Sequence, residues 1–251
     1  MSDLQERRSL PADIAIDSTT IAARVDHTLL TPSASREQVL ALCQEARDLG
    51  FGAVCVNGLW TSLVAQELDG SQVSTCTVVG FPLGASGTDV KAYEAAQAVE
   101  CGAQEIDMVL DIAAVQRGDG KAIEHEVQAV ARVVHADGAL LKVIIETCLL
   151  TDEQKVLACQ VAVSAGADYV KTSTGFSTGG ATADDVALMR RTVGEDIGVK
   201  ASGGVRTRAT AIEMLRAGAS RIGASAGAAL LRDDSAQPAV DAGDRPGNNT
   251  Y

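Results

Sequence analysis

The sequence predicts an α/β protein with the architecture of a (β/α)8 TIM barrel. Three observations lead to this fold class: short apolar strands recur eight times, amphipathic helical segments separate them, and a length of 251 residues is typical of one such barrel. The expected strands end near Asp26, Cys55, Val78, Asp107, Lys142, Lys171, Lys200 and Ala224, with 23 to 35 residues between successive ends. Each interval is long enough for one strand and one helix.

The segments between the strands carry helix signals. Ser35-x-x-Gln38 and Thr151-x-x-Gln154 have the form of capping boxes, and glycines such as Gly50 stand where helix C-caps are expected. Further amphipathic stretches cover 61–68, 89–100, 121–135, 183–193 and 207–217. No G-x-G-x-x-G motif follows the first strand, which argues against an open dinucleotide-binding sheet.

One domain is expected over residues 18–231. Residues 1–17 carry mixed charge and Pro11, and are predicted to form a flexible N-terminal lead. After Leu231 the composition changes to Asp, Pro, Gly, Asn and Ala, which cannot form a core. Residues 232–251 are therefore predicted to be a flexible C-terminal tail.

The composition limits the partners and the compartment. A net charge of -12 argues against nucleic acid and membranes as partners, because both require clustered Lys and Arg. The six cysteines are scattered, without a C-x-x-C pair or a zinc-like His spacing, so we expect neither a metal site nor disulfides. The first 20 residues lack the apolar core of a signal peptide. A reduced, cytoplasmic protein is expected.

Three lysines occupy equivalent positions in the repeat. Lys142, Lys171 and Lys200 each lie in a short apolar strand, where an ammonium group is costly to desolvate. A single strand lysine more often extends its charged end to solvent than takes part in catalysis. Three at the same phase favour a site, because a neighbouring cation helps to hold an amine neutral and nucleophilic. We predict that Lys171 forms a Schiff base.

Alternation along the strands predicts which polar side chains face the lumen. The predicted lumenal set contains three acids and three bases, namely Glu105, Asp107, Glu146, Lys142, Lys171 and Lys200. Buried charges of this kind must be paired. Active sites of barrels gather at the carboxyl ends of the strands, where we expect Asp26, Asp107, Lys171 and Lys200.

The loops after the seventh and eighth strands predict a phosphate site. They read Gly203-Gly204-Val205-Arg206 and Gly223-Ala224-Ser225-Ala226-Gly227. Barrels often bind phosphate at these two loops, through backbone N–H groups at glycines and a short helix N-terminus. Turn geometry alone explains each glycine pair equally well, but their joint position favours an anion site.

With these residues in view, the chain resembles the deoxyribose-phosphate aldolases, a family of class I aldolases that act through a lysine Schiff base. The resemblance is carried by Val25-Asp26-His27-Thr28-Leu29-Leu30, Val170-Lys171-Thr172-Ser173-Thr174-Gly175-Phe176 and Lys200-Ala201-Ser202-Gly203-Gly204-Val205-Arg206, and by residues 54–57, 80–84, 105–109, 141–147 and 221–225. These stretches follow the family's order over nearly the full chain.

The resemblance implies a role for each matching residue. Lys171 would form the imine, and Lys200 would lower the pKa of Lys171 so that its amine is uncharged. Asp107 would transfer protons through a water. Phosphate would be bound by Gly175, Gly203, Gly204, Arg206 and Ser225. Further substrate contacts are expected from Asp26, Cys55, Lys142, Thr172 and Gly223. The family commonly has a second serine where this chain has Ala226.

The last residue matches a terminal tyrosine of the family. The resemblance implies that Tyr251 enters the site during proton transfer, and the alternative interpretation is a disordered end with an incidental aromatic residue.

The implied reaction is the reversible cleavage of 2-deoxy-D-ribose 5-phosphate to D-glyceraldehyde 3-phosphate and acetaldehyde, in deoxyribonucleoside catabolism. No cofactor is expected, because the iminium ion itself accepts the electrons. The expected partners are the sugar phosphate, aldehydes and a second copy of the chain in a homodimer. Two alternatives stay open: a Schiff-base aldolase for longer sugar phosphates, and a sugar-phosphate binding protein without turnover.

Overall fold

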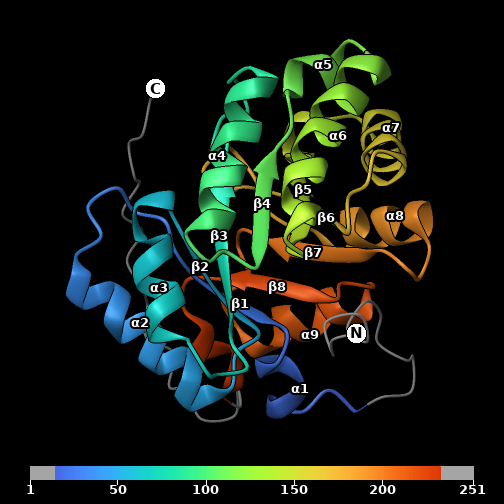
Figure 1. The fold of residues 1–251 in the computed structure, drawn as a ribbon. Helices are drawn as coiled ribbons and strands as arrows, with labels where there is room; N and C mark the ends of the chain where they lie inside the picture. The colour runs from blue at the N-terminus through green and yellow to red at the C-terminus, as the bar shows by residue number, and fades with distance from the viewer. Residues whose placement is uncertain (1–14, 233–251) are drawn as a thin grey trace.

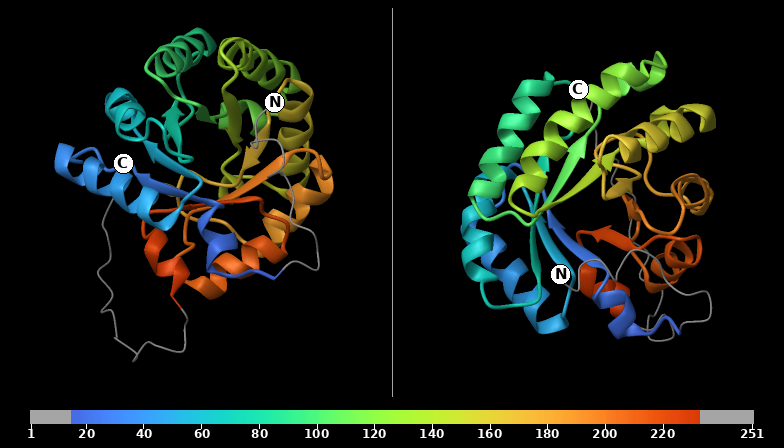
Figure 2. Two further views of the ribbon diagram at one scale, coloured as in Figure 1. Left: turned by 60° about the horizontal axis from the view of Figure 1, so that its bottom comes forward. Right: turned by 45° about the vertical axis from the view of Figure 1, so that its right-hand side comes forward.

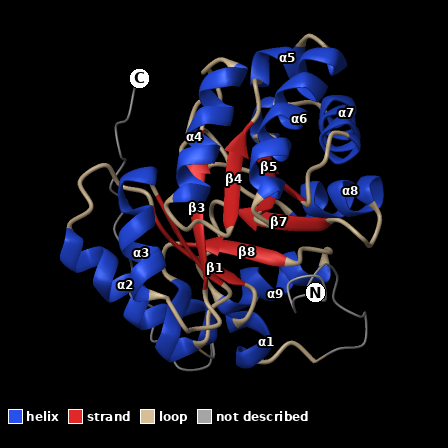
Figure 3. Ribbon diagram, viewed as in Figure 1, coloured by secondary structure: helices blue, strands red, loops and turns tan. Residues whose placement is uncertain are grey.

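The computed structural model describes residues 15–232 and confirms the predicted barrel. Eight parallel strands close in the order in which they occur in the chain, and helices form a ring around them (Figures 1 and 2). Figure 3 shows the strands gathered at the centre of the molecule. The strands are β1 (Val25–Leu29), β2 (Ala53–Val56), β3 (Ser74–Val79), β4 (Glu105–Val109), β5 (Leu140–Ile144), β6 (Tyr169–Lys171), β7 (Gly198–Ser202) and β8 (Arg221–Ala224).

The predicted helices are present, and short ones are added to them. The α-helices are α1 (Ser18–Ala22), α2 (Arg36–Leu49), α3 (Thr61–Glu67), α4 (Thr88–Glu100), α5 (Ile112–Gln116), α6 (Gly120–Ala136), α7 (Asp152–Ser164), α8 (Ala183–Val193) and α9 (Arg208–Arg216), with the 3-10 helices η2 (Gly58–Trp60), η3 (Thr147–Leu149) and η4 (Gly227–Leu231). Both predicted capping boxes form, before α2 and α7. The helices α1 and α5 span five residues each, too few to show a helical period in the sequence.

Several strands continue beyond the predicted ends. Strand β1 runs three residues past Asp26, and β4 and β7 run two residues past Asp107 and Lys200. These side chains face the lumen, so their charge does not interrupt the hydrogen bonds between strands. The prediction that they lie at the carboxyl ends is therefore wrong, whereas Lys171 is indeed the last residue of β6.

Glu146 also lies elsewhere than predicted. Strand β5 ends at Ile144, and Glu146 follows it in the left-handed conformation, with φ of 55°. Its carboxylate accepts hydrogen bonds from the backbone N–H and hydroxyl of Thr174, at 3.2 and 2.5 Å. Glu146 thus fixes the loop that follows β6.

The lumen is divided between an apolar and a charged part. Residues from β2, β3 and the loops after β1 and β3 form a small apolar cluster, which consists of Leu30, Ala53, Cys55, Cys76 and Val78 with Phe81 against it. The charged side chains come from the other strands. The main core lies outside the barrel, between the strands and the helices.

The predicted lead and tail fall largely outside the described residues. Residues 1–14 and 233–251, with Tyr251 among the latter, are not described. Within residues 15–232, no helix is both long and apolar enough to cross a membrane.

Candidate active site

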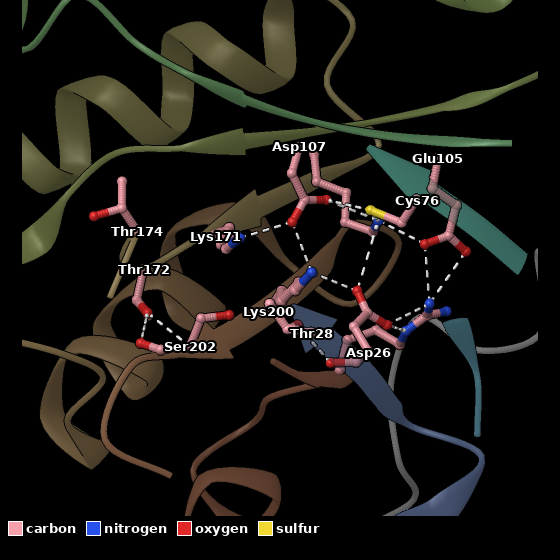
Figure 4. A network of polar contacts seen from close by, with 12 residues as sticks. Asp26, Thr28, Cys76, Glu105, Asp107, Lys171, Thr172, Thr174, Lys200 and Ser202 are labelled. Carbon is pink, nitrogen blue, oxygen red and sulfur yellow. Dashed lines mark hydrogen bonds and ion pairs between the residues drawn. The ribbon is translucent and has the colours of Figure 1, made fainter. Parts of the chain in front are cut away.

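Asp107 is the centre of a buried cluster of charges in the lumen (Figure 4). Its Oδ2 atom accepts hydrogen bonds from the Nζ atoms of Lys171 and Lys200, each at 2.7 Å. Its Oδ1 atom lies 2.9 Å from Nζ of Lys142. All four side chains are buried. The structure therefore brings together the predicted carboxylate and the three predicted lysines.

Strand register explains why these side chains meet. Asp107 in β4 lies opposite Lys142 in β5. Lys171 in β6 lies opposite Lys200 in β7. Residues that lie opposite one another in neighbouring strands point to the same face of the sheet, so all four side chains enter the lumen.

A second group of charges, made by Asp26, Glu105 and Arg221, lies beside the first. The guanidinium of Arg221 contacts Oδ1 of Asp26 at 2.6 Å and Oε2 of Glu105 at 2.9 Å. Lys142 contacts Glu105 at 2.5 Å, and Lys200 contacts Asp26. Figure 4 shows Glu105 on the side of Asp107 away from Lys171. This group thus anchors the cluster from the side opposite Lys171.

Sequence reasoning did not place Arg221 in the lumen. Arg221 begins β8 and precedes the apolar residue Ile222, so it has the pattern of a surface residue at a strand start. The feature that could have indicated a lumenal position is that Arg221 precedes Gly223 by two residues. Gly223 lies opposite Asp26 in β1. Two-residue spacing places Arg221 and Gly223 on the same, lumenal face.

Two acids of the cluster, Asp26 and Asp107, are held in the ionised form. Burial raises the pKa of Asp107, but Lys142, Lys171 and Lys200 outweigh it and hold that pKa well below its usual range. Burial likewise opposes ionisation of Asp26, and Arg221 with the two nearest lysines lowers its pKa. Asp26 and Asp107 therefore keep their negative charges at neutral pH.

The lysines differ in how strongly they are held as cations. Burial lowers the pKa of Lys200, yet Asp107 and Asp26 raise it above its usual value. Within residues 15–232, Lys142 has three carboxylates within 4.0 Å, Lys200 has two, and Lys171 has Asp107 alone. Lys171 is therefore the lysine with the fewest carboxylate partners of the three.

The cluster holds an excess of positive groups. It contains the four cations Lys142, Lys171, Lys200 and Arg221 and the three carboxylates Asp26, Glu105 and Asp107. Loss of one proton from a lysine would balance these charges. The site is therefore suited to chemistry that begins with an uncharged amine.

The thiols and carboxylates of the lumen do not suit a metal ion. The side chains of Cys55, Cys76 and Asp107, and those of Asp26, Cys76 and Glu105, lie close enough together to be ligands. However, Nζ of Lys142 lies 3.3 Å from Sγ of Cys76, 2.9 Å from Asp107 and 2.5 Å from Glu105. An ammonium group already compensates these donors, so a second cation would meet repulsion. Cys76 itself was not predicted to lie beside Asp107.

Several predicted substrate contacts come from the loops after β6 and β7. Gly175, Gly203 and Gly204 all have positive φ angles, between 81 and 84°. A methyl group on Gly203 would lie 3.5 Å from the Cα atom of Gly175, so the two loops touch. Arg206 and Ser225 are exposed. The structure thus brings the glycines together at the open end of the barrel.

The remaining predicted contacts are buried, except Gly223, which is partly exposed. The hydroxyl of Thr172 accepts a hydrogen bond from Ser202 N–H at 3.1 Å and donates to the Ser202 carbonyl at 3.2 Å. Cys55 packs in the apolar part of the lumen, while Asp26 and Lys142 belong to the ion-pair network. Gly223 lies opposite Ser202 in the neighbouring strand, and a methyl group on it would meet the side chains of Ser202 and Lys200.

Comparison with known proteins gives one consistent result. The family model described as DeoC/LacD family aldolase matches residues 14–237. A deoxyribose-phosphate aldolase of Listeria innocua is 57% identical over 212 residues, which cover 84% of this chain and 95% of that protein. Another, from Bacillus cereus, is 55% identical over 88% of this chain and 98% of its own length.

Solved structures agree with this relationship. One from Coccidioides immitis has a TM-score of 0.83 and 40% identity, over 89% of this chain and 87% of that one. The tetrameric deoxyribose phosphate aldolase from Aeropyrum pernix has a TM-score of 0.80 and 36% identity, over 85% of this chain and 91% of that one. With matching sequence, fold and a lysine-rich lumen, the chain belongs to the DeoC/LacD family of aldolases.

Proposed function

We propose that this aldolase reversibly cleaves 2-deoxy-D-ribose 5-phosphate to D-glyceraldehyde 3-phosphate and acetaldehyde through a Schiff base on Lys171. The observation that carries the proposal is the position of Lys171. It ends β6 at the open side of the cluster, with Asp107 as its one carboxylate partner within residues 15–232. The relatives described above, which are named for this substrate, support the choice of sugar.

The proposed reaction begins when neutral Lys171 attacks C1 of the open-chain sugar. Loss of water gives a protonated imine, which accepts the electron pair of the C2–C3 bond while a base takes the proton of the C3 hydroxyl. D-Glyceraldehyde 3-phosphate leaves, and the enamine is protonated at C2. Water then hydrolyses the imine, releases acetaldehyde and restores Lys171. The iminium ion is the electron sink, so the scheme needs no cofactor.

Two groups are proposed to assist Lys171. Lys200 stays protonated and shares Oδ2 of Asp107 with Lys171, which weakens the hold of that oxygen on the Lys171 proton. Asp107 is ionised before the reaction and is proposed to accept and return a proton through a water during it. Tyr251, outside the described residues, is proposed as a further group in the protonation of the enamine.

The substrate phosphate is proposed to bind at the open end of the barrel. The donors would be backbone N–H groups at Gly175, Gly203 and Gly204, with Ser225 and the cation of Arg206. Cys55, Thr172 and Gly223 are proposed to line the path from phosphate to imine. Asp26 and Lys142 lie within the ion-pair network, so we propose that they act through Lys200 and Asp107.

Reductive trapping tests this proposal. Borohydride added with the deoxypentose phosphate is expected to leave a reduced adduct on Lys171, which peptide mapping locates, and a coupled assay should detect acetaldehyde. The Lys171→Leu variant is the control and should give neither signal. An adduct on Lys142 or Lys200 would overturn the assignment. Cleavage of a hexose bisphosphate but not of the deoxypentose phosphate would show an aldolase for longer sugar phosphates. Binding of the deoxypentose phosphate without an adduct would show a binding protein without turnover.

A homodimer in the cytoplasm, acting in deoxyribonucleoside catabolism, completes the proposal. All six cysteines are free thiols in the structure, and four of them are buried, which suits a reducing compartment. The relative from Aeropyrum pernix is described as tetrameric. Light scattering after size exclusion separates the two assemblies: a dimeric mass is expected, and a tetrameric or monomeric mass would contradict it.

A further inference from the structure

Ser202 has a buried hydroxyl that no part of the mechanism uses. It is the last residue of β7 and lies two positions beyond Lys200, so both side chains face the lumen. Its side chain is buried, with 5% of the residue exposed. Among residues 15–232, its Oγ atom has no hydrogen-bond partner. Leaving a buried hydroxyl unpaired is unfavourable, so this atom is poised to bind a ligand.

The position of this hydroxyl is fixed by its surroundings. Thr172 binds both the N–H and the carbonyl of Ser202, which holds the backbone of that residue in place. A methyl group on Gly223 would lie 2.3 Å from Ser202 Oγ and 3.3 Å from Lys200 Cε. Glycine at 223 therefore leaves room for the hydroxyl beside Lys200, and Figure 4 shows the Ser202 side chain pointing toward that lysine.

Ser202 also lies between the groups that are proposed to bind the two ends of the substrate. Lys171, proposed to hold C1, is on one side of it, and Gly203 and Gly204, proposed to bind the phosphate on C5, follow it directly. A sugar phosphate that spans these two ends carries its C4 hydroxyl next to the phosphate-bearing carbon. Ser202 is thus placed to meet that hydroxyl.

We propose that Ser202 is a specificity-determining residue, whose hydroxyl binds the C4 hydroxyl of the sugar phosphate. This inference rests on the proposed function. In the synthetic direction the same group is the C2 hydroxyl of D-glyceraldehyde 3-phosphate. Ser202 therefore selects acceptor aldehydes that carry a hydroxyl beside the phosphate-bearing carbon.

Two acceptors test the proposal. Acetaldehyde is condensed either with D-glyceraldehyde 3-phosphate or with 3-oxopropyl phosphate, which keeps the phosphate and lacks the hydroxyl. The unchanged protein should prefer the first in kcat/KM. In Ser202→Ala this preference should fall roughly five-fold, the size of one neutral hydrogen bond, while kcat/KM for the second acceptor should stay within about two-fold. An unchanged preference, or an equal loss with both acceptors, would overturn the inference.

Stability separates this role from a structural one. Ser202→Ala removes no hydrogen bond seen within residues 15–232, so its Tm should equal or exceed that of the unchanged protein. The matched control is Ser220→Ala, because Ser220 is also buried but its hydroxyl binds Val199 N–H at 2.8 Å. Ser220→Ala should lower Tm and leave the preference intact. A lowered Tm in Ser202→Ala would assign that hydroxyl to folding.

The failure of the two proposals can be told apart. If the unchanged protein releases acetaldehyde from the deoxypentose phosphate and only the Ser202 result differs from expectation, the specificity role alone is overturned. If the unchanged protein releases none, both proposals are overturned.

Discussion

Lys171 and Lys200 donate to one and the same carboxylate oxygen, Oδ2 of Asp107, each at a distance of 2.7 Å. An oxygen shared by two ammonium groups sits between two charges that repel one another. Lys200 has Asp26 as a second carboxylate partner, whereas Lys171 has no second carboxylate partner within residues 15–232. Of the two lysines at this oxygen, Lys171 is therefore the one with less compensation from carboxylates.

Replacing Lys200 should suppress imine formation. In Lys200→Leu, Oδ2 of Asp107 is left to Lys171 alone, so Lys171 keeps its proton. Imine formation at pH 7 is expected to fall about 10- to 1000-fold, the range for removal of a charge at this distance. Borohydride trapping between pH 6 and 10 measures the effect, and Lys200→Arg, which retains the cation, should lose less. A pH profile identical to that of the unchanged protein would speak against the role of Lys200.

The ion-pair network should make the fold sensitive to acid. Asp26 and Asp107 have pKa values below those of an unfolded chain, so the unfolded state takes up protons first as the pH falls. Their contribution to stability is complete above about pH 4, the usual pKa of an aspartate, and is lost progressively below it.

The acid dependence can be assigned to Asp107 with one variant. Asp107→Asn should be less stable at pH 7, since three buried lysines lose a counter-charge, and its urea midpoint should fall less steeply between pH 5 and pH 3. Urea unfolding followed by circular dichroism gives both quantities. Parallel pH curves for the two proteins would show that Asp107 does not contribute.

Arg221 should matter chiefly for stability. Arg221→Met leaves Asp26 and Glu105 buried with one counter-charge fewer, which is expected to cost about 3–5 kcal/mol. Since Arg221 contacts Asp26 and Glu105 but not Lys171, acetaldehyde release per folded molecule should change much less. Denaturant unfolding measures the loss of stability. The control is Arg132→Met, because Arg132 is an exposed arginine on α6. Equal stability of the two variants would refute the stabilising role of Arg221.

Removal of Tyr251 tests the proposed role of the chain end. A variant that stops at Thr250 is expected to exchange the methyl protons of acetaldehyde with solvent more slowly, because enamine protonation is impaired, while phosphate binding is retained. Exchange in heavy water followed by NMR measures the first, and competition by inorganic phosphate measures the second. Equal exchange rates in both proteins would remove Tyr251 from the mechanism.

The barrel and the central charges could be predicted because they depend on local, repeated patterns. A strand period of two and a repeat of about 30 residues are visible without tertiary information. These patterns placed Asp107, Lys142, Lys171 and Lys200 in one lumen, and the strand register confirms it.

Other features depend on contacts between distant parts of the chain. Arg221 has the local pattern of a surface residue, and its partner Asp26 is 195 residues away. Cys76 has the local pattern of a core residue of β3, but in the fold its Sγ atom lies 3.3 Å from Oδ1 of Asp107 in β4. Glu146 continues the alternation of β5, yet it turns into the left-handed region to bind Thr174. No local pattern distinguishes these cases from the ordinary ones.

The absence of Ser202 from the ion-pair network has a consequence for altering this enzyme. Asp26 and Glu105 are paired with Arg221, Lys142 and Lys200, whereas the Ser202 hydroxyl has no hydrogen-bond partner among residues 15–232. A substitution of Ser202 therefore removes none of the ion pairs among the buried groups. Redesign for new aldehydes should begin at Ser202 and leave the ion-paired charges unchanged.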